Sequence, residues 1–171
     1  AQTVVDAAFL DPYNSFKIEL NNSRISSHEY HYQAASEFLT YAKTNDVAVW
    51  LNMHAVTEAQ RRKGDDGLPV APFAEDTEGG GKFVNRADCF ITLHRKIQSP
   101  DHTIRRMTEV HVRKVRETET GGQPTPFDEP YLMNMNLSHT AFKGWHSKQA
   151  LFDPVKIEEK QESIDFSSIP L

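Results

Sequence analysis

The sequence predicts an α/β domain that begins with a strand–helix–strand unit. Residues 7–11 are apolar up to a final aspartate, and residues 47–53 are β-branched and aromatic without a charge. Runs of this kind are typical of strands. Between them, apolar residues recur at helical spacing. A strand, a helix and a second strand in this order predict two parallel strands joined by a right-handed crossover, both covered on their two faces.

The helix carries start and stop signals. Ser26 is followed three residues later by Glu29, which is the pattern of a capping box. Asn45 and Asp46 are expected to end the helix. One apolar stripe lies between these points, formed by Tyr30, Ala34, Ala35, Phe38, Leu39 and Ala42.

Three further strands are predicted at residues 89–95, 107–116 and 130–136, and the last two can pair as a hairpin. The polar segment 55–80 is long enough to be functional or disordered, and glycines 79–81 lead into a helical turn. Cys89 is expected to be a small buried hydrophobe at a strand start. We therefore expect one core over residues 1–136, a mostly parallel sheet flanked by helices, and an acidic tail over residues 137–171.

Composition limits the classes of protein. The 171 residues carry a formal net charge of −5, so contact with nucleic acid requires a local basic patch. A single cysteine excludes an internal disulfide and favours a reducing compartment. No apolar stretch approaches the roughly 18 residues of a membrane span, and no signal peptide is visible. These features predict a cytoplasmic protein without a membrane partner.

Two polar residues follow the first two predicted strands. Asp11 ends the first, and His54 comes just after the second. Ligands bind at the carboxyl ends of parallel strands, so both residues face one edge of the sheet. A carboxylate there can hold Mg²⁺ beside nucleotide phosphates, and a histidine can bind a phosphate or a water. The alternative is that Asp11 caps a turn and His54 begins a loop.

Other motifs are weak or incomplete. The glycines before Lys82 do not form a phosphate-binding Walker A loop, because Asp76 and Phe83 stand where that pattern needs glycine and serine or threonine. His28 and His31 lie three apart on the helix and could bind metal, but no third ligand is evident. A solvated helix face is the favoured interpretation of this pair.

The order of these pieces resembles the carboxy-terminal half of the RecA-like motor of DnaB-type replicative helicases, and within them the Twinkle and phage primase-helicase branch. The resemblance covers roughly residues 7–136. It rests on "FLDPYNSF", "NDVAVWLNMH", "DTEGGGKFVNRADCFITLHR" and "TEVHVRKVRETETGG" in that order, with a helix and a polar loop between them.

The resemblance implies roles for individual residues. Asp11 would be the Walker B aspartate that positions magnesium, and His54 would sense the terminal phosphate. Asp88 would be the acid that closes the next motif. Lys114 and Arg116 would reach the nucleotide of the neighbouring subunit, with Arg116 as the arginine finger. Two-residue spacing puts both on one strand face, although a solvated basic strand is the alternative.

The resemblance also implies that segment 55–86 faces a central channel and touches single-stranded DNA. The basic residues in or beside its loops are Arg61, Arg62, Lys63, Lys82 and Arg86. The glycine run departs from the serine-rich version of the family. The Walker A loop and catalytic glutamate of the family would lie upstream of the Walker B strand, so this chain alone is expected to hydrolyse ATP poorly.

The resemblance therefore implies part of an ATP- and Mg²⁺-dependent helicase ring, expected to be a hexamer, that moves on single-stranded DNA in bacterial or phage replication and could work with a primase. Two alternatives stay open. One is another RecA-like ATPase, such as a recombination mediator or a circadian-clock-type protein. The other is a non-catalytic nucleic-acid-binding or assembly module that has lost the motor.

Overall fold

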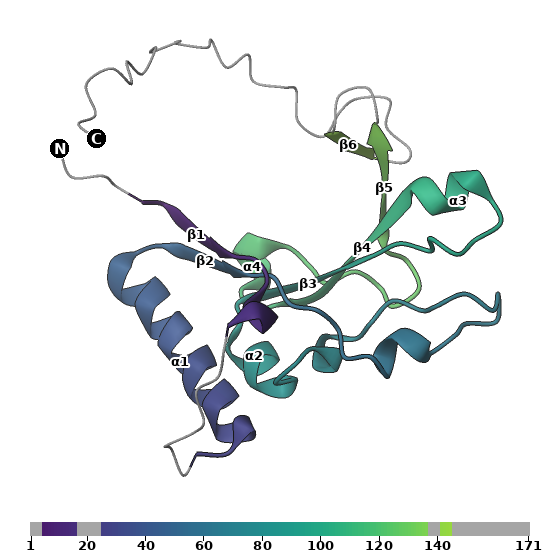
Figure 1. Ribbon diagram of the computed structural model, residues 1–171. Coiled ribbons are helices and arrows are strands. Elements are labelled where there is room, and N and C mark those ends of the chain that lie inside the picture. Colours follow the sequence, from purple (N-terminus) through teal and green to yellow (C-terminus); the bar gives the residue numbers. More distant parts are fainter. Residues whose placement is uncertain (1–4, 17–24, 137–140, 145–171) are drawn as a thin grey trace, which may run out of the picture.

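The computed structural model describes residues 5–16, 25–136 and 141–144, and the strands in these ranges form two sheets (Figure 1). A parallel pair contains β1 (Ala7–Leu10) and β2 (Ala48–Leu51). An antiparallel sheet has the order β3 (Cys89–His94), β4 (Met107–Val115), β5 (Tyr131–Asn136) and β6 (Ala141–Gly144).

Helix α1 (Ser27–Asn45) begins and ends where its capping residues predict. The Ser26 hydroxyl accepts a hydrogen bond from the backbone N–H of Glu29 at 3.2 Å. Asp46 adopts the left-handed conformation with φ 53° and donates its backbone N–H to the carbonyl of Ala42. Both devices satisfy backbone groups that a helix end leaves unpaired, and the predicted helix is confirmed.

The α/β class and the parallel strand–helix–strand unit are confirmed, but the balance of the sheets is not mostly parallel. Within the described residues only β1 and β2 are parallel. The three later strand pairs are antiparallel, including the expected pairing of β4 with β5. Connections of few residues join β3 to β4 and β5 to β6, and such connections suit antiparallel neighbours rather than long crossovers.

The polar segment after β2 is ordered by short helical turns and isolated bridges. Ala55 pairs with Thr77, and Lys63 pairs with Pro69. Helix α2 includes the predicted turn with Lys82 and Arg86. The short helices of the chain are η1 (Tyr13–Ser15), η2 (Ala59–Arg61), η3 (Ala74–Asp76), α2 (Gly81–Arg86), α3 (His102–Arg106) and α4 (Thr118–Gly121).

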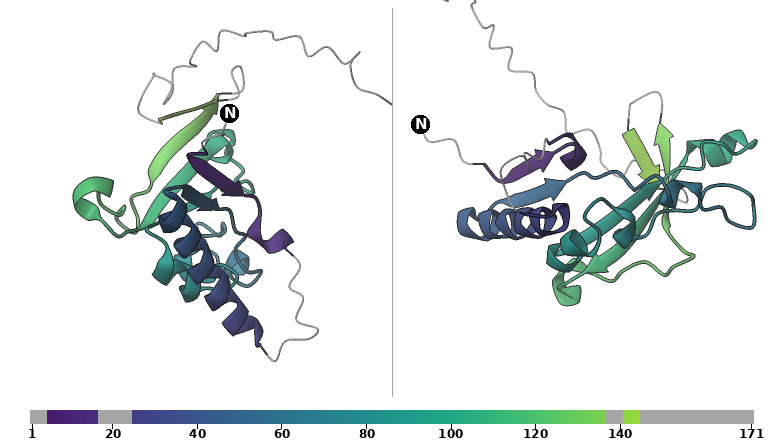
Figure 2. Two further views of the ribbon diagram at one scale, coloured as in Figure 1. Left: turned by 90° about the vertical axis from the view of Figure 1, so that its left-hand side faces the viewer. Right: turned by 60° about the horizontal axis from the view of Figure 1, so that its bottom comes forward.

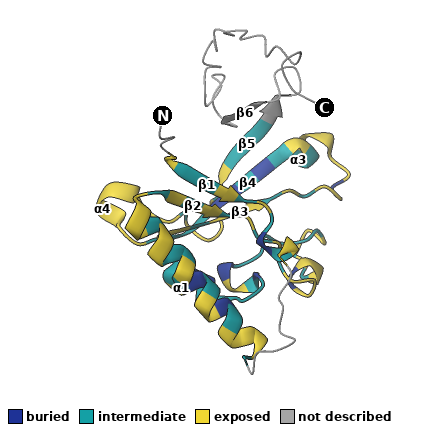
Figure 3. Cartoon of the chain, turned by 60° about the vertical axis from the view of Figure 1, so that its left-hand side comes forward, coloured by how far each residue is buried: buried dark blue, intermediate teal, exposed yellow. Residues whose placement is uncertain are grey.

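The core lies where α1 meets α2, β2 and η1 (Figure 3). Tyr13, Ala35 and Phe83 are buried together there. The ring centroids of Tyr13 and Phe83 are 4.8 Å apart and the rings meet edge to face, which is a favourable aromatic arrangement. The predicted stripe of α1 supplies Ala34, Ala35 and Phe38 to this core.

One face of the parallel pair is open, contrary to the expectation of strands covered on both faces. Helix α1 covers one side of β1 and β2 (Figure 2). On the other side Phe9 and Trp50 stack at 5.9 Å between centroids and remain 69% and 49% exposed. Two parallel strands with a single helix can cover only one of their faces.

Two other expectations differ from the structure. Cys89 is exposed, because it begins the outer strand β3 and its side chain lies on the open face. Strand β6 pairs with β5 beyond residue 136, so the sheet continues past the predicted end of the core. The rest of the predicted acidic tail lies outside the described residues. No helix in the described part is long and apolar enough to cross a membrane.

Candidate functional site

The parallel pairing of β1 and β2 brings Asp11 and His54 to one edge of the sheet. Leu10 is paired with Leu51, so both strands end at the same level. The backbone continues this pairing for one step, since Asn52 donates its N–H to the carbonyl of Leu10 at 2.9 Å. Asp11 follows β1 directly, and both Asp11 and His54 are exposed. The shared edge inferred from strand order is therefore present.

Asn14 ties the two strand ends together and was assigned only a turn role from the sequence. Its Oδ1 accepts the backbone N–H of His54 at 2.9 Å, and its Nδ2 donates to the carboxylate of Glu78. One side chain thus joins the end of β1, the end of β2 and the glycine-rich turn before α2. A polar residue soon after a strand-ending aspartate was the only sequence signal for this function.

A buried Tyr13–His31 pair lies under the same edge. The Tyr13 hydroxyl and His31 Nδ1 are 2.9 Å apart, and His31 is only 4% exposed. Its Nε2 lies 4.0 Å from a carboxylate oxygen of Glu78. Burial, with smaller contributions from Tyr30 and Glu78, raises the pKa of Tyr13 to about 12. A protonated phenol can donate to Nδ1, which leaves Nε2 to carry the hydrogen that faces Glu78.

The prediction that His28 and His31 lie on a solvated helix face is wrong for His31. His28 is exposed, but His31 points into the core, where a polar partner satisfies it. Helical periodicity places His31 beside Ala35 on the buried side, and that position was the missed signal. Within the described ranges, no group of three His, Cys, Asp or Glu residues could hold a metal ion.

The glycine-rich turn must be glycine where it crosses α1. Gly79 has φ 76°, and a Cβ there would lie 2.8 Å from the Phe83 ring and 3.0 Å from His31. Such a distance is shorter than carbon atoms tolerate, so only glycine lets α2 approach α1 this closely. The turn was expected to be a flexible loop, but it is packed into the core.

Lys114 and Arg116 lie on one face of β4, as their spacing predicts, and both reach the end of α2. The Lys114 ammonium donates to the Val84 carbonyl at 2.6 Å. The Arg116 guanidinium donates to the Arg86 carbonyl at 3.0 Å and pairs with Asp88 at 2.6 Å. Cations favour the carbonyl end of a helix, although α2 is short. Burial, followed by the charge of Arg116, lowers the pKa of Lys114.

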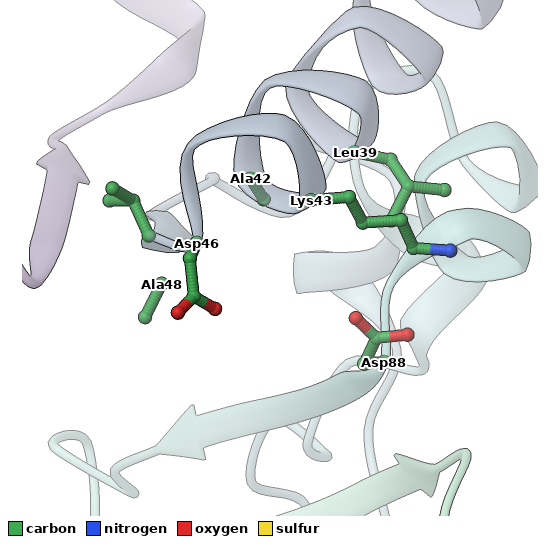
Figure 4. A pocket seen from close by; sticks show the side chains of 7 residues that line it. Leu39, Ala42, Lys43, Asp46, Ala48 and Asp88 are labelled. Atoms are coloured by element: carbon green, nitrogen blue, oxygen red, sulfur yellow. The ribbon is translucent and has the colours of Figure 1, made fainter.

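This basic pair lies at the opposite edge of the parallel sheet from Asp11. Asp88, the partner of Arg116, lines a hollow of about 280 Å³ with Asp46 and Ala48 (Figure 4). Ala48 is the first residue of β2, whereas Asp11 follows the last residue of β1. Arg116 and Asp11 of one chain therefore face away from each other.

The predicted DNA-binding residues divide into two groups. Arg62 pairs with Asp76, and Arg86 donates to the Ser36 hydroxyl at 2.6 Å while covering the ring of Tyr32. These two guanidinium groups hold the fold together. In the part of the chain that the structure describes, the remaining cations form no ion pair: Arg61 and Lys63, which are exposed, and Lys82, which is half-buried.

The donor set at the Asp11 edge fits one half of a nucleotide site. Mg²⁺ commonly takes one or two protein carboxylates and completes its shell with water and phosphate oxygens, so a single exposed Asp11 is chemically suitable. The sequence contains no Walker A pattern to cradle phosphates. The roles of Asp11 and His54 stay predictions.

Comparison with solved structures supports the fold. A structure of the ATPase domain of a DnaB-like helicase matches with a TM-score of 0.61 and 16% sequence identity. The match covers 80% of this chain and 43% of that chain, so this chain spans less than half of the matched length. No family model matches, and no curated protein matches. The fold is that of a RecA-like ATPase domain in part, as the motif order predicts.

Proposed function

We propose that this chain is the part of an ATP-driven, ring-forming DNA helicase that runs from the Walker B aspartate to the arginine finger. The likeness of its fold to an ATPase domain supports a nucleotide-hydrolysing motor. The helicase branch, the ring and the replicative role rest on the motif order. A ring of six subunits, in contact with a primase, is the assembly that this resemblance implies.

The observation that carries the proposal is the placement of Asp11 and Arg116 at opposite edges. A subunit with this geometry can present its Asp11 and His54 to one nucleotide and its Arg116 to the nucleotide of its neighbour. Head-to-tail contacts of this type close into rings. An arginine from a neighbour stabilises the charge that develops on a transferred phosphoryl group.

Two residues would act at the nucleotide edge. Asp11 would hold Mg²⁺, which when bound neutralises phosphate oxygens. His54 would hydrogen-bond a phosphate oxygen, and the Asn14 amide fixes the backbone of His54 for that task. Arg116 would have to exchange its pairing with Asp88 for the neighbour's phosphate. Side chains that are partly exposed can make such an exchange at modest cost.

Single-stranded DNA would be held through its phosphates by the cations that form no ion pair within the described residues. Arg61, Lys63 and Lys82 are the candidates, because Arg62 and Arg86 already have partners in the fold. Contacts of this kind are largely independent of base sequence and weaken with salt. Hydrolysis at the subunit interfaces would move the segment that carries these cations along the strand.

The decisive experiment mixes two variants of the intact protein. Asp11→Asn alone should lose Mg²⁺-dependent hydrolysis, and Arg116→Ala alone should lose roughly 10³-fold or more of its turnover while still binding nucleotide. Mixed rings should regain activity, because an Arg116→Ala subunit supplies an intact nucleotide edge and an Asp11→Asn subunit supplies an intact finger. Arg106→Ala, an exposed basic residue, is the matched control. Mixed rings without activity would refute the finger in trans.

The alternatives predict other results. Strand pairing without unwinding by the intact protein would indicate a recombination-type RecA-like ATPase. Binding of single-stranded DNA with no hydrolysis in any preparation of the intact protein would indicate a binding or assembly module.

A further inference from the structure

Two aromatic rings stack where segment 62–77 lies against β4. The centroids of Phe73 and Phe127 are 5.5 Å apart, and the ring planes differ by 22°. Phe73 precedes η3, and Phe127 lies in the connection between α4 and β5. Phe127 is 61% exposed although one of its faces covers Phe73. Its other face is therefore open to solvent.

Guanidinium groups surround this aromatic pair. Arg62 lies 4.8 Å from the centroid of Phe73, and Arg113 lies 5.6 Å from the centroids of both rings. Asp76 neutralises Arg62, whereas Arg113 donates to the carbonyl of Pro72 at 3.3 Å. Among the described residues, the Nε donors of both arginines are buried without a hydrogen-bond partner, and no carboxylate forms an ion pair with Arg113. Arg113 thus keeps a positive charge beside the rings.

A hollow of about 260 Å³ opens beside the rings, lined by Phe73, Arg113, Thr125, Phe127 and Glu75. Glu75 is the acidic group in this lining, and it disfavours a bare phosphate inside the hollow. A planar, uncharged aromatic group fits the open face of Phe127 better than an anion does. Its attached phosphate could remain outside, within the field of Arg113.

We propose that this surface, formed by Phe73, Arg113 and Phe127, takes a base of single-stranded nucleic acid. The base stacks on the open face of Phe127, and Arg113 attracts the backbone next to it. Stacking of this kind is tolerant of sequence because every base has an aromatic face. The inference rests on the proposed function for the class of ligand. It adds a stacking contact to the phosphate contacts proposed above.

The first test places a reporter at the surface. In Phe127→Trp, an oligothymidylate of about 16 nucleotides should quench the added fluorescence to saturation, since a stacked base quenches indole. Inorganic triphosphate should not quench it. Tyr41→Trp, at another aromatic position with similar exposure, should give no added quenching. Absence of quenching in Phe127→Trp, or equal quenching by triphosphate, would overturn the stacking assignment.

The second test measures affinity for the same labelled oligonucleotide by fluorescence anisotropy. Phe127→Ala and Phe127→Leu should each weaken binding roughly five- to hundredfold, because leucine keeps apolar bulk but cannot stack. The dependence of affinity on salt should not change, since no phosphate contact is lost. Tyr41→Ala should bind as the unmodified chain does.

The outcomes separate this inference from the proposed function. If the triple change of Arg61, Lys63 and Lys82 to alanine removes binding while Phe127→Ala has no effect, only the stacking inference is overturned. If Phe127→Ala weakens binding and the triple change does not, the proposed phosphate contacts fail and the stacking surface stands. If the unmodified chain binds no oligothymidylate, the inference is overturned, and the mixed-ring experiment still decides the motor.

Discussion

The buried phenol of Tyr13 should make the stability of this chain depend on alkaline pH. Its pKa is raised from 10.0 to about 12 in the folded state. The folded state therefore keeps the proton where the unfolded state releases it. Stability is fully present below the unfolded pKa and is lost as pH rises through the folded pKa.

The size of the effect follows from the raised pKa. A shift of about 2 units corresponds to about 2–3 kcal/mol of unfolding free energy, at about 1.4 kcal/mol per unit. Tyr13→Phe removes the ionisation and also leaves His31 buried without its partner. That second loss should cost about 1–3 kcal/mol near neutral pH.

Urea unfolding of the chain and of Tyr13→Phe, followed by circular dichroism, tests this reasoning. The difference in unfolding free energy should be about 1–3 kcal/mol at about pH 8 and should fall by about 2–3 kcal/mol by about pH 12. Tyr41→Phe, at an exposed position, should change stability by less than about 0.5 kcal/mol at about pH 8. A difference between Tyr13→Phe and the unmodified chain that stays constant across this range would refute the raised pKa.

Two other perturbations test the construction of the site. Asn14→Ala and Glu78→Ala should be coupled by about 1 kcal/mol in a double-mutant cycle of unfolding free energy, because their side chains share a hydrogen bond; strictly additive effects would contradict that contact. Gly79→Ala should cost about 2–4 kcal/mol, from its left-handed backbone and the contact with Phe83. Gly67→Ala has similar φ but nothing within 4 Å of the added carbon, so it should cost only about 1 kcal/mol, and equal losses would argue against the close approach.

Local signals were sufficient for the elements and for one edge of the site. Ser26 and Asp46 define the ends of α1 because capping depends on groups only a few residues apart. Strand, helix and strand in succession were enough to bring Asp11 and His54 to the same edge. Two-residue spacing placed Lys114 and Arg116 on one face of β4.

Burial at single positions was less predictable. His31 is buried because Tyr13 offers it a hydrogen bond, and Cys89 is exposed because it lies on an outer strand. Neither partner nor strand position can be read from adjacent residues. The same limit explains why Asn14 was taken as a turn residue, since its two partners lie 40 and 64 residues away.

What the sequence by itself determined about this protein is its set of helices and strands, their order, and the shared edge of Asp11 and His54. These depend on capping, periodicity and the handedness of one crossover. Only the tertiary structure decided that the later strands are antiparallel, that Arg62 and Arg86 are held within the fold, and that Arg116 faces away from Asp11. The physical reason is that each of these outcomes depends on contacts between segments distant in the sequence.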